Sequence, residues 1–206
     1  MRPLAALLSI GEKSEPGPSP GFTRAHLLLA FLTIGNSRTI GRQALAQDIG
    51  LGEGSIRTVL KKLREEGYVD ADTTGCHLTV LGARLYRETL SALSPMISIK
   101  DSRLTVGSHH VGMLVRSGAR KVATGIDQRD AAILVGAAGA TTYVIKEGKF
   151  AVPGGSHDCE RDFPSGTWSL LRAGLSPKNG DAVVLCGASN DSTARLGALS
   201  AALTLL

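Results

Sequence analysis

The stretch IGLGEGSIRTVLKKLREEGYV, residues 49–69, decides the fold of the first half of the chain. Gly50 and Gly52 enclose a tight turn, and the residues after them have the spacing of an amphipathic helix. Its apolar positions are Ile56, Val59, Leu60 and Leu63. Gly67 marks the end of this helix, because glycine adopts the left-handed conformation common just past a helix C-terminus. A helix is therefore expected over residues 54–66.

Weaker signals on both sides of this stretch complete the pattern. The expected elements are helices over 22–35, 42–49 and 54–66, strands over 68–71 and 77–80, and a helix over 82–93. A Thr-Thr-Gly turn between the two strands indicates a β-hairpin. The order predicts a winged helix-turn-helix domain over residues 22–93, in which three helices precede a hairpin wing. The alternative is a small helical domain that only dimerises or binds protein.

The expected helix 54–66 leaves a basic and hydroxyl-bearing face free once its apolar face is packed. A helix of this width fits the major groove of DNA, where Arg57 is the best candidate for a bidentate contact to guanine. The lysines and Arg64 are expected on phosphates, and the N–H groups of the first turn also favour a phosphate. The candidate DNA-binding residues are Arg42, Gly54, Ser55, Arg57, Thr58, Lys61, Lys62, Arg64 and His77. For the lysines, a solvated helix surface is the alternative.

Composition sets broad limits on the function. The 206 residues carry a formal net charge of +5, which suits an anionic partner, and no apolar run is long enough to span a membrane. The three cysteines are far apart, which disfavours a disulfide framework or a zinc site and favours a reducing cytoplasm. The N-terminus lacks the pattern of a signal peptide. No cofactor and no metal are expected.

The rest of the chain divides into a leader, a linker and a second domain. Residues 1–21, rich in Gly, Pro and Ser near their end, are expected to form a flexible leader, and residues 94–101 a linker. Residues 102–206 give the order ββαββ, an insertion, then βα. The second strand of this order is placed at 121–124. The fold class is therefore α+β, with a C-terminal two-layer sandwich of helices on one face of a mixed or antiparallel sheet.

Two loops of the second domain are candidate ligand sites. Asp127, Gln128 and Arg129 open one helix, and Ser189 and Asn190 precede another, where free N–H groups can hold an anion. The alternative for the second loop is a helix cap.

The loop around His157, Asp158 and Cys159 contains metal-ligand types, but adjacent residues seldom bind one ion together. A catalytic pair is also disfavoured, because a nucleophile needs an oriented base within hydrogen-bond reach. We expect no catalytic residues and no enzyme.

Three runs of residues carry a resemblance to a known family. They are GPSPGFTRAH (17–26), IGRQALAQDIGLGEGSIRTVLKKL (40–63) and GIDQRDAAILVGAAGATTYVIKEGK (125–149). They resemble archaeal winged-helix proteins that carry a C-terminal domain of unknown function, itself similar to the GAD-type domain of some aminoacyl-tRNA enzymes. The resemblance implies a transcription factor without an assigned effector. The chain departs from it in a wing that is poor in basic residues and in the loop from His157 to Cys159.

The leading hypothesis is a transcriptional regulator in which residues 22–93 bind double-stranded operator DNA. Residues 102–206 would then form a homodimer, sense a small-molecule effector, or both. The apolar segment 196–206 is either part of a dimer surface or, as is commoner for such a helix, part of the core. Two copies are needed to recognise a palindrome with half-sites about one helical turn apart. The alternatives are a regulator that is also an enzyme for a phosphorylated metabolite, acting near Arg129 and Ser189, and an RNA- or protein-binding adaptor.

Overall fold

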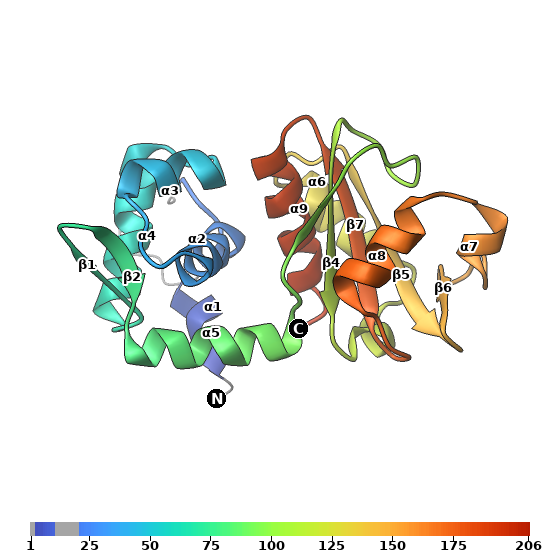
Figure 1. The fold of residues 1–206 in the computed structure, drawn as a ribbon, viewed down its shortest axis with the longest axis horizontal. Helices are drawn as coiled ribbons and strands as arrows, with labels where there is room; N and C mark the ends of the chain where they lie inside the picture. The colour runs from blue at the N-terminus through green and yellow to red at the C-terminus, as the bar shows by residue number, and fades with distance from the viewer. Residues whose placement is uncertain (1–2, 11–20) are drawn as a thin grey trace. The chain divides into compact units, whose positions relative to one another are not determined.

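The computed structural model describes residues 3–10 and 21–206. The chain divides into two compact units, Met1–Leu90 and Ser91–Leu206, which are treated separately below (Figure 1).

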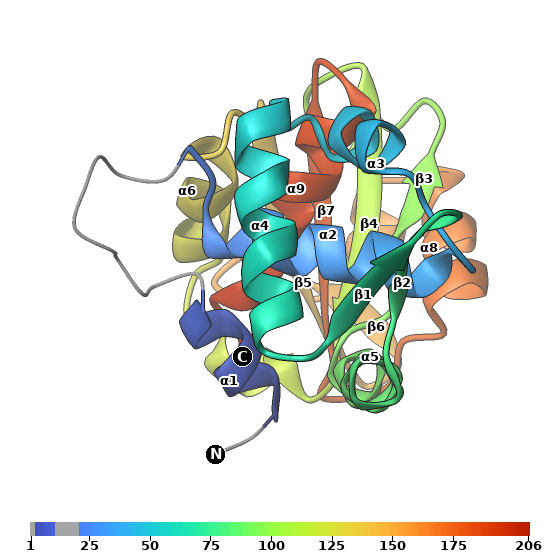
Figure 2. The same ribbon diagram turned by 90° about the vertical axis from the view of Figure 1, so that its left-hand side faces the viewer.

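The first unit is the winged helix-turn-helix that the sequence predicts. Its elements are α1 (Pro3–Ile10), α2 (Arg24–Asn36), α3 (Arg42–Ile49), α4 (Glu53–Glu65), β1 (Val69–Asp72), β2 (Gly75–Leu78) and α5 (Val80–Ala92). Gly50 ends α3 in the left-handed conformation with φ of 71°, which allows the chain to turn sharply into α4. β1 and β2 pair antiparallel to form the wing. Figure 2 shows α4 leading through a short turn into β1.

The core of the first unit lies around α2, which is buried along most of its length. Leu27, Leu28 and Phe31 are among its fully buried side chains. The Phe31 ring meets the rings of Tyr68 and Tyr86 edge to face, each with centroids 6.3 Å apart. Through these ring contacts α2 packs against the residue that precedes β1 and against α5, which stabilises the position of the wing on the helical core.

The prediction of a flexible leader over residues 1–21 is wrong for residues 3–10. Pro3–Ile10 forms helix α1, which packs against α2, and Leu7 and Ile10 are buried. Burial of these apolar side chains lowers the free energy by more than the ordering of this short segment raises it. Residues 11–20, the remainder of the expected leader before Gly21, lie outside the described residues.

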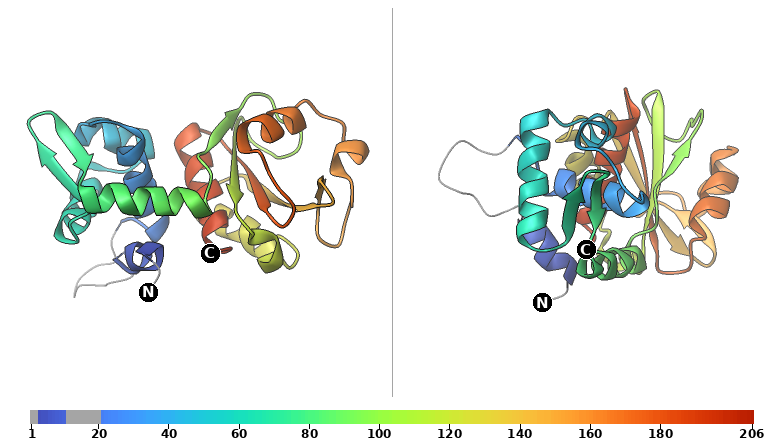
Figure 3. Two further views of the ribbon diagram at one scale, coloured as in Figure 1. Left: turned by 60° about the horizontal axis from the view of Figure 1, so that its bottom comes forward. Right: turned by 60° about the vertical axis from the view of Figure 1, so that its left-hand side comes forward.

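The second unit is built on an antiparallel sheet of order β3-β4-β7-β5-β6. Its elements are β3 (Ile97–Ile99), β4 (His109–Val115), η1 (Gly118–Lys121), α6 (Ile126–Ile133), β5 (Gly139–Lys146), β6 (Lys149–Ala151), α7 (Cys159–Asp162), α8 (Thr167–Leu175), β7 (Ala182–Ala188) and α9 (Asp191–Leu203). Helices α6 and α9 cover one face, and α8 packs on β3 and β4 from the other (Figure 3). The α+β class and the antiparallel sheet are confirmed, and α8 adds a helix to the second face.

Two details of the second unit differ from the expectations, and a third was left open. No strand forms at 121–124, because the 3₁₀ helix η1 ends at Lys121 and irregular chain follows it. The sheet instead takes β3 from the expected linker 94–101, where Ile99 is buried and pairs with His110. Of the two roles considered for segment 196–206, the structure shows core packing for the apolar face of α9. Its leucines, Leu196, Leu199 and Leu203, are buried in the core. Because α9 packs both on the sheet and against α6, its apolar residues are buried in the core.

Candidate nucleic-acid interface

Helix α4 packs and exposes the residues that its periodicity predicts. Ile56, Val59, Leu60 and Leu63 are buried. The opposite face exposes Gly54, Thr58, Lys61 and Glu65. The Thr58 hydroxyl donates to the carbonyl oxygen of Gly54 at 3.2 Å, one turn earlier. A local hydrogen bond of this kind contributes little to helix stability, so the hydroxyl remains available to a partner.

A groove of about 840 Å³ separates α4 from the wing. Arg57, Lys61 and Arg64 line it from α4, and Arg42 lines it from the start of α3. The structure therefore gathers four of the predicted DNA-binding residues around one depression. The other side of the groove is acidic, since the wing contributes Asp70 and Asp72.

The four basic residues of the groove differ in their partners. Lys61 lies 3.7 Å from Glu65, and Arg64 lies 3.5 Å from Asp70. Among the described residues, no carboxylate lies within 4.0 Å of Arg42 or Arg57. Both of these side chains are exposed. An incoming anion can bind these two guanidinium groups without displacing an internal ion pair.

The wing itself is acidic, and hydrogen bonds between Asp72 and Thr74 stabilise its turn. The carboxylate of Asp72 accepts from the backbone N–H and the hydroxyl of Thr74, at 2.7 and 2.6 Å. These bonds lower the pKa of Asp72, so the carboxylate stays charged. His77 is half-buried, with Nδ1 3.9 Å from Asp72, and no Lys or Arg occurs from Gly67 to Ala83. The wing therefore offers no lysine or arginine to a minor groove, and His77 faces a carboxylate.

Cys76 lies at the groove, a position that sequence reasoning did not single out. Its side chain is 5% exposed, and burial raises the pKa of the thiol while the charges of Arg64 and Arg42 oppose that rise. The alternation of the hairpin, in which every second residue faces inward, is the signal that could have placed it there. The raised pKa keeps the thiol neutral near pH 7, so it adds no charge to the groove.

Two predicted residues lie on the far flank of α4. Ser55 and Lys62 are half-buried and do not line the groove. The N-terminus of α4 follows Gly52 and has no side-chain cap, and Glu53 places a negative charge in its first turn. A phosphate at these N–H groups would meet that carboxylate, so the α4 contacts are stronger candidates on the groove side.

The candidate ligand residues of the second unit do not form one site. Gln128 is 3% exposed, and its amide donates to the hydroxyl of Thr204 at 2.6 Å, just past the end of α9. Asn190 stands at the other end of α9, where its side-chain oxygen accepts from the Thr193 N–H at 2.9 Å and caps the helix. The 13 residues of α9 separate the two places by roughly 20 Å. Exposed Ser189 lies beside Asn190.

On α6, the two charged candidates are exposed. Arg129 pairs with its neighbour Asp130 at 3.0 Å, and Asp127 stands in the first turn of the helix.

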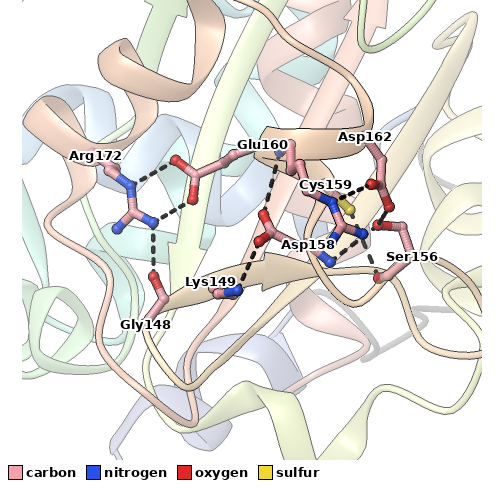
Figure 4. A network of polar contacts seen from close by, with 9 residues as sticks. Gly148, Lys149, Ser156, Asp158, Cys159, Glu160, Asp162 and Arg172 are labelled. Carbon is pink, nitrogen blue, oxygen red and sulfur yellow. Dashed lines mark hydrogen bonds and ion pairs between the residues drawn. The ribbon is translucent and has the colours of Figure 1, made fainter.

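A network of ion pairs surrounds the loop from His157 to Cys159 (Figure 4). Asp158 lies 2.8 Å from Lys149 and caps α7, which lowers its pKa, while burial raises the pKa of the Cys159 thiol. The guanidinium of Arg172 bonds both Glu160 oxygens and the carbonyl of Gly148. No cluster of three metal-ligating side chains occurs in the part of the chain that the structure describes.

Among the described residues, no helix is long and apolar enough to cross a membrane.

Comparison with known proteins gives partial matches to two family models. Residues 28–84 match the model described as PH0730-like, N-terminal domain, and residues 106–205 match a domain of unknown function, DUF4443. None of the curated proteins compared with the chain matches it significantly. These matches agree with the resemblance to winged-helix regulator-like proteins with an uncharacterised C-terminal domain. They give no support to the similarity with GAD-type domains.

Two solved structures are similar to this chain. The hypothetical protein PH0730 from Pyrococcus horikoshii OT3 aligns with a TM-score of 0.72 and 24% identity, over 89% of this chain and 92% of that one. At this identity the likeness establishes a shared fold across both units. A MarR family protein from Mycobacterium tuberculosis, Rv2887, aligns over 43% of this chain and 66% of that one, with 21% identity and a TM-score of 0.31, too low to indicate a shared fold.

Proposed function

We propose that the chain is a transcriptional regulator that binds double-stranded DNA through α4. One observation carries the proposal, namely that Arg57 and Arg42 are exposed at the groove with no carboxylate partner among the described residues. Arg57 stands on the flank of α4 that borders the groove, where a guanidinium can reach a base edge when the helix enters the major groove. Lys61 and Arg42 supply phosphate contacts that fix the position of the helix.

The charge of the groove sets the expected strength of binding. Four basic residues, Arg42, Arg57, Lys61 and Arg64, face three acidic ones, Glu65, Asp70 and Asp72, which leaves a net charge of +1. Two or three phosphate contacts per copy give a slope of log affinity against log salt of roughly −2 to −3. One copy should therefore bind weakly at physiological salt, and we propose that the protein acts as a homodimer on two half-sites in the cytoplasm.

The second unit supports the role of an oligomerisation or effector domain rather than that of an enzyme. Gln128 and Asn190 are engaged in internal hydrogen bonds, and the acidic residues of the loop at 156–162 are engaged in internal contacts. We propose that this unit carries no catalytic site, and that any effector is bound elsewhere than at these residues.

The experiment is selection of DNA from a random duplex library by the full-length protein, followed by titration of the selected site. We expect a palindromic consensus with half-sites about 10 base pairs apart, or a multiple of that spacing. Titration of a matched RNA duplex is the control. Equal affinity for the RNA, or the absence of any enriched sequence, would overturn the proposal in favour of an RNA- or protein-binding adaptor.

A further inference from the structure

Helix α6 presents apolar side chains to solvent. Ile126 is 49% exposed, Ile133 is 47% exposed and Leu134 is 85% exposed. The buried side of the same helix is formed by Gln128 and Ala132, which pack toward α9 and the sheet. An eight-residue helix that directs its larger apolar side chains outward is unusual for a soluble surface and indicates a covering partner.

The outward face of α6 has a defined order of chemistry. Ile126 and Ile133 are seven residues apart, so they lie on one line along the helix, about 10 Å from each other. Arg129 and Asp130 stand between them, both about half-exposed, and form an ion pair at 3.0 Å. The face therefore runs from an apolar end through a basic and an acidic residue to a second apolar end.

This order is complementary to itself. A two-fold axis that crosses the helix midway between residues 129 and 130 places residue 126 opposite residue 133 of a second copy and residue 129 opposite residue 130. Each isoleucine then meets an isoleucine, and each arginine meets a carboxylate. An isologous interface requires this property, that one patch matches its own rotated copy.

We propose that the exposed face of α6 is the two-fold interface between two copies of this chain. The Arg129 and Asp130 side chains, which pair with each other in one copy, exchange partners across the axis, so neither of these two charges is left unpaired. Ile126, Ile133 and Leu134 are removed from water on both copies. Two eight-residue helices bury less area than a specific interface of standard size, so the association should be concentration-dependent. The inference names the dimer surface of the proposed regulator, but it does not depend on DNA binding.

The test is sedimentation velocity of the full-length protein without DNA, over a range of concentrations. Arg129→Asp places two carboxylates opposite each other in both halves of the interface, and it should weaken dimerisation roughly tenfold or more. The double variant Arg129→Asp with Asp130→Arg restores the complementary order and should restore the dimer. Arg103→Asp makes the same substitution at an exposed position outside α6 and is the matched control.

Each outcome decides the inference. Loss of the dimer in Arg129→Asp and its recovery in the double variant, with Arg103→Asp unchanged, supports the α6 interface. A wild-type protein that stays monomeric at all concentrations, or a dimer that Arg129→Asp leaves intact, overturns it. Since DNA is absent, a failure here is separate from a failure of the proposed DNA binding.

Discussion

Replacement of Arg57 by alanine is the sharpest test of the proposal that α4 recognises DNA. The side chain is exposed and pairs with no carboxylate among the described residues, so its loss should change the free energy of unfolding by no more than about 0.5 kcal/mol. A bidentate contact to guanine contributes about 1–3 kcal/mol of binding. At about 1.4 kcal/mol for each factor of ten, affinity for the selected site should fall roughly 5- to 150-fold.

The assay is fluorescence anisotropy with the selected duplex and with a scrambled duplex, at several salt concentrations. If Arg57 contacts a base, the variant loses affinity for the selected duplex and loses little for the scrambled one. If Arg57 contacts only phosphate, both affinities fall together and the salt slope becomes shallower by about 0.9.

A matched control separates these effects from the general loss of a positive charge. Arg84 belongs to α5 and pairs with Glu88, and it does not line the groove between α4 and the wing. Arg84→Ala should leave the difference between selected and scrambled duplexes unchanged. Unaltered affinity of Arg57→Ala for the selected site would refute the assignment of Arg57 and, with it, the recognition role given to this face of α4.

Three further predictions concern single side chains. Asp70→Asn removes a carboxylate from the groove and releases Arg64, so DNA affinity measured by anisotropy should rise severalfold; a fall would contradict the electrostatic account. Burial holds the pKa of His26 below its ordinary value of 6.5, and its Nδ1 accepts a hydrogen bond from the Thr23 N–H. Protonation of His26 therefore destabilises the folded first unit, and its melting temperature should decrease as pH falls below about 6.5. In His26→Gln this decrease should be smaller. Asn190→Ala removes the cap of α9 and should cost about 1 kcal/mol in denaturant unfolding, whereas Asn190→Asp should keep most of it.

The first unit was predictable from the sequence because its signals are local. Gly50 and Gly67 both adopt positive φ, at 71° and 73°, at the ends of α3 and α4, where the sequence placed the breaks. The apolar residues of α4 point in one direction and face the core, so its exposed face followed from a period of 3.6. The acidic side of the groove did not follow, because it depends on how the wing folds back toward α4.

The second unit was harder to predict because its structure depends on contacts between distant residues. β3 has only three residues, and it is a strand because Ile97 and Ile99 pair with β4, a partner that periodicity does not reveal. The same reason left the role of α9 open in the sequence. Its apolar length fits either a dimer surface or the core, and only its contacts with the sheet and with α6 show that its leucines belong to the core.

The two proposed surfaces, the α4 groove and the exposed face of α6, depend on each other because the net charge of the groove is small. One copy offers two arginines, Arg42 and Arg57, that an anion can bind without breaking an internal pair. Such a copy cannot distinguish an operator from bulk DNA by charge alone, and a second copy held by α6 adds an equal set of contacts without a second association step. By linkage, an operator with two half-sites must favour the α6 dimer by the same factor by which the dimer favours the operator. A change confined to the α6 face, far in sequence from α4, should therefore change the occupancy of DNA.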